Sequence, residues 1–176
     1  MKCDDLPLVK WLVLDLETTV KRIDGRIDNS PKNPDNRCVS AHYGWLGLET
    51  VDQVHTDLWY HKELYSPDGI DRLKQHLAEA DGMICHNVKF DAEWLLEMGF
   101  ELPPIVRDTM ITEYLLAKGQ RRLLSLKESA LRRKTESLKK SDLVDELFKG
   151  GTGFSEMPLD VVVEYAEADV KACGEL

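Results

Sequence analysis

Three acidic segments carry the residue types that could perform metal-dependent chemistry. Asp15 and Glu17 lie two residues apart at the end of an apolar run, so on a strand their carboxylates would project from the same face. Two such carboxylates repel each other unless a proton or a cation neutralises them, and their oxygens suit Mg²⁺ or Mn²⁺. The pair alone is weak evidence, because a second Asp-x-Glu pair occurs at Asp91 and Glu93 and an isolated pair is usually a solvated strand end.

A second segment places Asp91 about one turn into a helix that is expected after a short strand, where a helix N-terminus stabilises a carboxylate. Asn87 can cap that helix, so an ordinary cap and an ordinary first-turn acid explain the segment equally well. In a third segment, Tyr165 and Asp169 are four residues apart and share one helix face, as on many amphipathic helices. The three segments are stronger evidence together than alone, because their residue types, their order along the chain and the elements expected around them agree. Asp91 follows Asp15 by 76 residues, and Asp169 follows Asp91 by 78.

The elements that must position these residues follow from the hydrophobic pattern and the turn residues. Residues 21–37 are polar and contain two prolines, which predicts a long loop. Strands are expected at 11–14, 38–48, 54–60, 82–85 and 105–107. Helices are expected from Ser66-Pro67 to Ala80, from Asn87 to Gly99, at 109–118, 125–133 and 141–149, and from Pro158 through Asp169. Strands come first along the chain, and strands alternate with helices after them. This order predicts an α/β fold, with a mixed sheet flanked by helices.

Length and composition fit one soluble domain spanning residues 1–176. The 176 residues suit a single domain, and 43% hydrophobic with 31% charged residues exclude a disordered or low-complexity chain. No window approaches the roughly 20 apolar residues of a membrane span, and no apolar signal core follows Met1, so we expect a cytoplasmic protein. The cysteines form no C-x-x-C pair, which argues against a zinc site or a disulfide framework: Cys3, Cys38, Cys85 and Cys173.

The net charge of −9 hides an uneven distribution. Residues 118–140 contain nine basic and two acidic side chains, a net of +7, which leaves −16 on the rest of the chain. A protein that holds both metal cations and a phosphate backbone could have this distribution, although a solvated helical face explains a charge run equally simply.

The three segments together resemble the DEDD family of 3′–5′ exonucleases, in its tyrosine-containing branch. The alternative branch carries histidine five residues before the last aspartate, where this chain has Glu164. The resemblance extends from about residue 10 to 175 and narrows to the proofreading domain of phage-type family A DNA polymerases. That similarity rests on Leu16-Glu17-Thr18-Thr19, a polar loop ending Asn33-Pro34-Asp35-Asn36-Arg37, the segment from His86 to Asp91, and Asp108-Thr109 before a leucine-rich helix.

The resemblance implies a ribonuclease H-like fold and a two-metal-ion mechanism. Four carboxylates would hold two divalent ions, Mg²⁺ or Mn²⁺: Asp15 between the two, Glu17 and Asp169 on the nucleophile side, and Asp91 on the second ion. Two such ions can stabilise the attacking and the leaving oxygen of an in-line displacement. Tyr165 would orient the attacking water, because a phenol with a pKa near 10 is a poor general base at neutral pH.

Substrate contacts are expected beside these positions. Leu16 and Thr18 would contact the terminal nucleotide, whereas Phe90 would either stack near the last bases or pack in the core. Asn87 would hydrogen-bond the strand or only cap its helix, and His86 is expected to be structural, since Mg²⁺ prefers oxygen ligands. The phosphate backbone would be followed by three basic residues: Arg121, Arg122 and Lys127.

The implied function is removal of nucleoside 5′-monophosphates from DNA 3′ ends, with a proofreading role in DNA replication. The domain would be free-standing or part of a family A polymerase, in a bacterial host cytoplasm if phage-encoded. Expected partners are single-stranded DNA or frayed 3′ ends, and a polymerase domain or replication proteins, with no membrane. Three alternatives stay open: an RNase D-like 3′–5′ exoribonuclease, a catalytically silent nucleic-acid-binding module of the same fold, and a structure-selective endonuclease.

Overall fold

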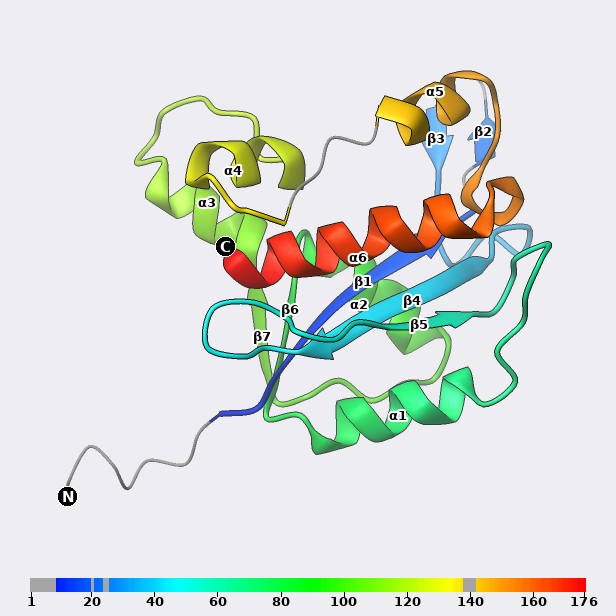
Figure 1. Cartoon of the computed structure of the whole chain (residues 1–176), viewed down its shortest axis with the longest axis horizontal. Coiled ribbons are helices and arrows are strands. Elements are labelled where there is room, and N and C mark those ends of the chain that lie inside the picture. Colours follow the sequence, from blue (N-terminus) through cyan, green and yellow to red (C-terminus); the bar gives the residue numbers. More distant parts are fainter. Residues whose placement is uncertain (1–8, 20, 24–25, 138–141) are drawn as a thin grey trace.

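A five-stranded mixed sheet forms the centre of the computed structural model, which describes residues 9–19, 21–23, 26–137 and 142–176. The strand order is β5-β4-β1-β6-β7 (Figure 1). These strands are β1 (Trp11–Thr18), β4 (Cys38–Trp45), β5 (His55–Leu58), β6 (Gly82–Cys85) and β7 (Ile105–Asp108). Antiparallel pairs join β1 to β4 and β4 to β5, whereas β1–β6 and β6–β7 are parallel. The predicted α/β fold class, a ribonuclease H-like mixed sheet flanked by helices, is confirmed.

Six α-helices and one short 3₁₀ helix surround the sheet within the described ranges. They are α1 (Gly69–Glu79), α2 (Val88–Glu97), α3 (Thr109–Leu116), α4 (Leu126–Arg133), α5 (Asp142–Lys149), η2 (Phe154–Glu156) and α6 (Leu159–Glu175). No helix in the described part of the chain is both long enough and apolar enough to cross a membrane.

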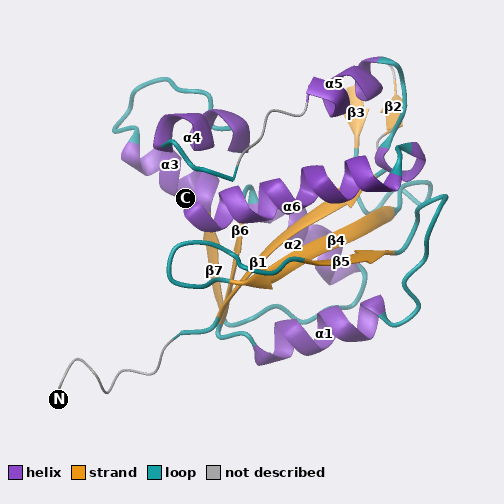
Figure 2. Cartoon of the chain, viewed as in Figure 1, coloured by secondary structure: helices purple, strands orange, loops and turns teal. Residues whose placement is uncertain are grey.

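Side-chain alternation along β1 divides the core between the two faces of the sheet. Leu12, Leu14 and Leu16 are buried in the core on the side of α1 and α2. Val13 points the other way and packs with Val170 of α6. Figure 2 shows the corresponding layers, with α6 crossing one face of the sheet and α1 covering the other. The odd-numbered residues of β1 therefore face α6, and these include the acidic pair.

Two local differences separate the structure from the sequence prediction. Part of the predicted loop forms a two-stranded ribbon, β2 (Lys21–Ile23) with β3 (Arg26–Asp28), which has too few apolar residues to show a strand pattern. The helix expected from Ser66-Pro67 to Ala80 is present as α1 but begins only at Gly69, so its predicted start was wrong. The Ser66 hydroxyl instead accepts the Leu58 N–H at 3.1 Å and fixes the end of β5.

Candidate active site

The acidic pair lies on the part of β1 that extends past its neighbour β6. The parallel pairing of these two strands runs only from Trp11 to Val13, so Asp15 and Glu17 lie beyond it. Asp15 is partly exposed, and Glu17 is buried. Both face α6, because alternate residues of a strand share one face. The predicted common orientation of the two carboxylates therefore holds.

Asp91 occupies the first turn of α2, as predicted, and is 2% exposed. Its Oδ1 accepts the backbone N–H of Leu16 at 3.1 Å. That N–H belongs to the part of β1 beyond the last β1–β6 pair, so the Asp91 carboxylate satisfies a donor that the sheet leaves free. This bond places Asp91 beside the backbone between Asp15 and Glu17.

The third segment lies on α6, whose apolar stripe packs against the sheet. The stripe consists of Val162, Ala166, Val170 and Cys173, all buried. Tyr165 and Asp169 each precede a stripe residue by one position and are partly exposed. The Tyr165 ring packs against Phe154 with ring centroids 5.7 Å apart. Burial, and after it the charge of the nearby Asp169 carboxylate, raises the pKa of the Tyr165 hydroxyl. The phenol therefore lies beside the acidic residues.

Burial and mutual repulsion shift the pKa values of these five residues. Burial, followed by the charges of Asp91 and Asp169, raises the pKa of Asp15 well above its ordinary value. The pKa of Glu17 is raised by burial and by the other three carboxylates, Asp15 foremost. Residues of β1, α2 and α6 therefore lie near enough to influence one another's ionisation.

The pKa values of Asp91, Asp169 and Tyr165 are also raised. Burial raises the pKa of Asp91 to about 8 although the Leu16 N–H opposes the shift, and raises that of Asp169 to about 6 against the hydrogen bond from Tyr165. The pKa of Tyr165 is raised by burial and then by Asp169, Glu17 and Asp15, so its hydroxyl stays protonated at neutral pH. The protein thus keeps one neutral phenol beside four carboxylates that are costly to ionise.

The donor set of this acidic cluster (Asp15, Glu17, Asp91 and Asp169) fits hard divalent cations such as Mg²⁺ or Mn²⁺, which prefer carboxylate oxygens. In the described part of the chain, no three acidic, histidine or cysteine side chains converge closely enough to hold an ion as they stand. Like charges oppose such convergence, and bound cations would offset the repulsion that raises the pKa values of these groups. The chemistry of the residues therefore fits the metals that the sequence implies.

The residues expected to contact substrate near the acidic cluster differ in their surroundings. Leu16 is buried in the core, with its side chain on the face opposite Asp15, and Thr18 is buried at the end of β1. Phe90 is partly buried and packs against the core on the side of α1 and α2. Asn87 is exposed and precedes α2, but its side chain makes no cap hydrogen bond, so the predicted capping role was wrong.

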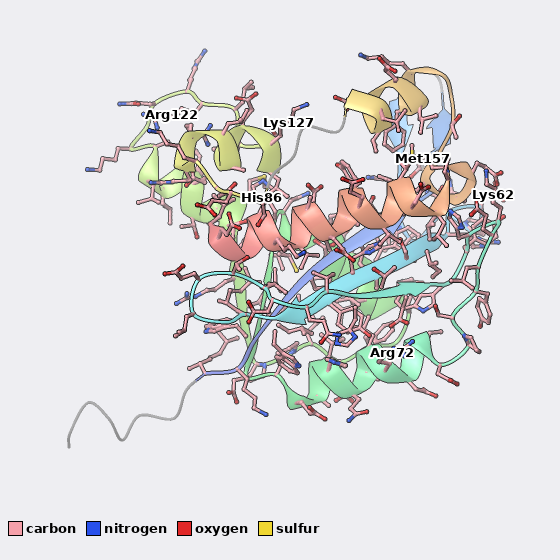
Figure 3. All side chains as sticks on the ribbon, viewed as in Figure 1. Lys62, Arg72, His86, Arg122, Lys127 and Met157 are labelled. Carbon is pink, nitrogen blue, oxygen red and sulfur yellow. The ribbon has the colours of Figure 1, made fainter. Side chains whose placement is uncertain are left out.

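The basic segment surrounds α4, which packs on α6. Arg121 and Arg122 are exposed on the loop before α4, and Lys127 pairs with Asp145 at 3.3 Å. Figure 3 shows Arg122 and Lys127 on the α3–α4 side of the molecule. Two other arginines of the segment, Arg132 and Arg133, bind Glu113 instead, and Lys139 and Lys140 lie outside the described residues.

His86 connects this region to the sheet and has a structural role, as expected. Its Nδ1 lies 2.8 Å from Thr109 Oγ1, and its Nε2 lies 2.7 Å from the carbonyl oxygen of Leu124. The imidazole thereby joins the end of β6 to the start of α3 and to the loop that precedes α4.

One residue beside the site was not assigned a role from sequence. Asp108 ends β7 and accepts backbone N–H groups at the start of both α2 and α3. Its side chain also contributes to the raised pKa of Asp91. An aspartate directly before a helix is a recognisable N-cap signal for α3, but its contact with α2 depends on the tertiary structure.

Comparison with known proteins identifies a family. A family model described as 3′-5′ exonuclease, of the DNA polymerase A type, matches residues 47–176, well over half of the chain. The matched region includes Asp91, Tyr165 and Asp169, whereas Asp15 and Glu17 precede it. Comparison with curated proteins gives no match. With most of its length matched, the chain belongs to the 3′–5′ exonuclease domain family of the DNA polymerase A type.

Proposed function

We propose that this protein is a metal-dependent DNA exonuclease of the tyrosine-containing DEDD branch, related to phage-type proofreading domains. It removes nucleoside 5′-monophosphates from the 3′ ends of single-stranded or frayed DNA during replication in the cytoplasm, with two divalent ions, Mg²⁺ or Mn²⁺. The observation that supports this proposal is the acidic cluster with Tyr165: residues from β1, α2 and α6 shift one another's pKa values.

In the proposed reaction, water attacks the phosphorus of the last phosphodiester. The bond from phosphorus to the 3′ oxygen of the preceding nucleotide breaks, which leaves a shortened strand with a 3′ hydroxyl. When bound, the two cations would supply stabilisation of charge on the attacking and leaving oxygens. Asp15, Glu17, Asp91 and Asp169 hold these cations.

Tyr165 positions the attacking water. Its ring packs against Phe154, which fixes the orientation of the phenol, and its hydroxyl is affected by the charge of Asp169. Because its pKa is raised, it acts by hydrogen bonding and not as a base. Thr18 and the backbone of Leu16, whose side chain is buried on the opposite face, contact the terminal nucleotide in this proposal, with Phe90 and Asn87 beside the last bases.

The exposed basic residues guide the remaining strand. Arg121 and Arg122 have no acidic partner among the described salt bridges, and Lys127 shares its charge with one exposed aspartate, Asp145. Contacts of such side chains with phosphates contribute affinity that falls as the salt concentration rises. In this proposal the basic residues bind the strand and the acidic cluster carries out cleavage.

Digestion of a 5′-labelled single-stranded DNA oligonucleotide tests the proposal, with Mg²⁺, with Mn²⁺ and with EDTA. We expect a metal-dependent ladder that shortens one nucleotide at a time and disappears in Asp15→Ala. Glu164→Gln is the matched control, since this exposed acid of α6 is adjacent to Tyr165 and outside the acidic cluster. Full activity of Asp15→Ala with an unchanged fold would contradict the proposal.

The same assay separates the other activities that this fold could support. Preferential digestion of an RNA oligonucleotide of the same sequence would indicate an exoribonuclease, and cleavage of a circular single strand would indicate an endonuclease. Binding of the intact strand without cleavage under either metal would indicate a binding module. Faster removal of a mismatched than of a matched 3′ nucleotide from a primer would support proofreading.

A second substitution tests the role given to the phenol. We expect Tyr165→Phe to lower kcat by on the order of 10²-fold with little change in KM, because the ring packing stays and only the water-orienting hydroxyl is lost. Steady-state kinetics on the labelled oligonucleotide measure both constants. Tyr114→Phe, which removes a hydroxyl from an exposed tyrosine of α3, should behave like the wild type.

A further inference from the structure

The residue before α2 has an unusual backbone conformation. Asn87 lies in the left-handed region, with φ of 70°, which is uncommon outside glycine although asparagine adopts it more readily than most residues. Its own side chain makes no cap hydrogen bond to α2, so the turn is held by groups outside this helix. Because Asn87 is four residues before Asp91, whatever holds it also determines where α2 begins.

Asp108 supplies the contacts that hold this turn. Its Oδ1 accepts the Asn87 N–H at 3.1 Å, and its Oδ2 accepts the Val88 N–H at 3.1 Å. The same carboxylate caps α3, with Oδ1 accepting the N–H groups of Met110 at 2.8 Å and Ile111 at 3.3 Å. Oδ1 therefore accepts three of these four N–H groups and Oδ2 accepts one, so a single carboxylate serves the first residues of both helices.

The sheet topology explains why one aspartate can reach two helices. Cys85 of β6 pairs with Asp108 of β7 in a parallel register, so the two strands end side by side. Each strand is followed by a helix, and the two helix N-termini therefore open next to each other. Their free N–H groups and their dipoles both favour a negative charge at this point.

A continuous series of contacts connects Asp108 to the acidic cluster. Val88 is the first residue of α2, and Asp91 follows in the first turn of the same helix. The Asp91 Oδ1 then accepts the Leu16 N–H at 3.1 Å, on the strand that carries Asp15. A shift of the first turn of α2 would therefore move the Asp91 carboxylate away from β1.

We propose that Asp108 is a positioning residue of the exonuclease site, whose carboxylate holds Asn87 in its left-handed conformation and so fixes Asp91 beside β1. This inference rests on the function proposed above, because it assigns Asp108 an effect on the metal ligands. In this proposal Asp108 acts through the four backbone N–H groups that its carboxylate accepts and is not counted among the metal ligands.

Asp108→Ser separates the two tasks of this carboxylate. Serine is a good N-cap and keeps the cap of α3, but its short side chain does not reach Asn87 and Val88. We expect the affinity for Mn²⁺, measured by titration calorimetry, to fall by about 10- to 100-fold, as for other residues that orient metal ligands. Protection of the Leu16 amide from hydrogen exchange should fall in parallel, whereas KM for the oligonucleotide should change little.

Rescue provides the most specific readout. Glycine adopts positive φ without steric cost, so Asn87→Gly in the Asp108→Ser background should restore part of the Mn²⁺ affinity. Asp81→Asn is the matched control, because Asp81 also accepts a backbone N–H, from Lys10 at 2.8 Å, but at the opposite end of β1. This control should bind Mn²⁺ like the wild type.

The possible outcomes are distinguishable from failure of the proposed function. A wild type that cleaves DNA, together with an Asp108→Ser variant that is folded and keeps full Mn²⁺ affinity and Leu16 protection, would overturn the role of Asp108 alone. Equal losses in Asp81→Asn would overturn it as well. A wild type without metal-dependent cleavage would overturn the proposed function, and Leu16 protection in Asp108→Ser would still report on the positioning role.

Discussion

Asp91 is a nearly fully buried carboxyl whose surroundings favour its protonated form. Burial raises its pKa from 3.8 to about 8. Because the folded-state pKa is the higher one, the stabilising contribution of this group is complete below pH 3.8 and is lost as the pH rises through about 8. At neutral and alkaline pH, ionised Asp91 therefore lowers the stability of the metal-free protein, as expected for the metal ligand that we propose it to be.

Substitution of this carboxyl by an amide should reveal that conflict between stability and activity. We expect Asp91→Asn to raise the free energy of unfolding in EDTA at pH 8 by about 1–2 kcal/mol, or the Tm by roughly 2–8 °C, and to abolish cleavage. The Asn oxygen can still accept the Leu16 N–H, so the contact with β1 survives. Thermal unfolding followed by circular dichroism measures the change, which should shrink toward pH 4.

Glu93→Gln provides the control for this prediction. Glu93 lies two residues further along α2 and is exposed, so its substitution should leave both the Tm and the activity close to wild type. A lower Tm of Asp91→Asn at pH 8 would contradict the assignment of Asp91 as a destabilising carboxylate.

Much of the candidate site could be predicted from sequence because side-chain spacing determines the shared faces. Asp15 and Glu17 are two apart on a strand, and Tyr165 and Asp169 are four apart on a helix. The error at Asn87 has a tertiary cause. The acceptor for the α2 N-terminus is contributed by Asp108, 21 residues away, and no local pattern indicates such a partner.

At the scale of elements, the basic segment is organised by one buried acid on α3. Glu113 is 5% exposed and binds Arg132 of α4 at 3.1 Å and Arg133 at 2.7 Å. Burial alone would raise the pKa of Glu113, but the hydrogen bonds and charges of the two arginines outweigh it and lower the pKa. Two charges that sequence analysis counted toward a phosphate-binding surface therefore join α3 to α4.

We expect Glu113→Gln to destabilise the protein by about 1–3 kcal/mol at pH 7, since it leaves two arginines without their counter-charge. Because the folded-state pKa is lowered, the contribution of Glu113 is present above its ordinary pKa of 4.5 and is lost as the pH falls below it. Urea unfolding at pH 7 and at acidic pH measures the difference between variant and wild type, which should narrow in acid.

The exposed ion pair of the same region serves as the comparison. Asp145→Asn removes the partner of Lys127, and both side chains are largely solvated, so the cost should stay below about 0.5 kcal/mol. An equal effect of the two substitutions would show that burial does not strengthen the Glu113 contacts.

Element positions were predictable where an apolar pattern was strong, as in the central strand β1 and in α6. They were less predictable where polar side chains decide the outcome. Ser66 has the sequence of a helix cap, yet its hydroxyl binds the Leu58 N–H across the turn. The sequence of the β2–β3 ribbon likewise has too few apolar residues to distinguish it from a loop.

At the scale of the whole molecule, the strand order brings the acidic residues together. The first strand of the chain lies at the centre of the sheet, antiparallel to β4 and parallel to β6. This order does not follow from periodicity, and the resemblance to nucleases led only to the expectation of a ribonuclease H-like mixed sheet. With β1 central and longer than β6, its acidic end is covered by α6 and approached by α2, so one site collects residues from distant parts of the chain.

With the metal site proposed here, the stability of the folded protein should depend on divalent cations and on pH together. Protons and Mg²⁺ would compete for the same carboxylates, whose pKa values are raised to about 8 for Asp91 and to about 6 for Asp169. We expect millimolar Mg²⁺ to raise the Tm by several degrees at pH 8, as binding to the folded state alone requires, and by much less near pH 5. Differential scanning fluorimetry with Mg²⁺ or with EDTA measures the shift, and Asp15→Ala should remove it while Glu93→Gln retains it. A Mg²⁺ shift that is equal at the two pH values, or unchanged in Asp15→Ala, would place the bound cation away from this cluster.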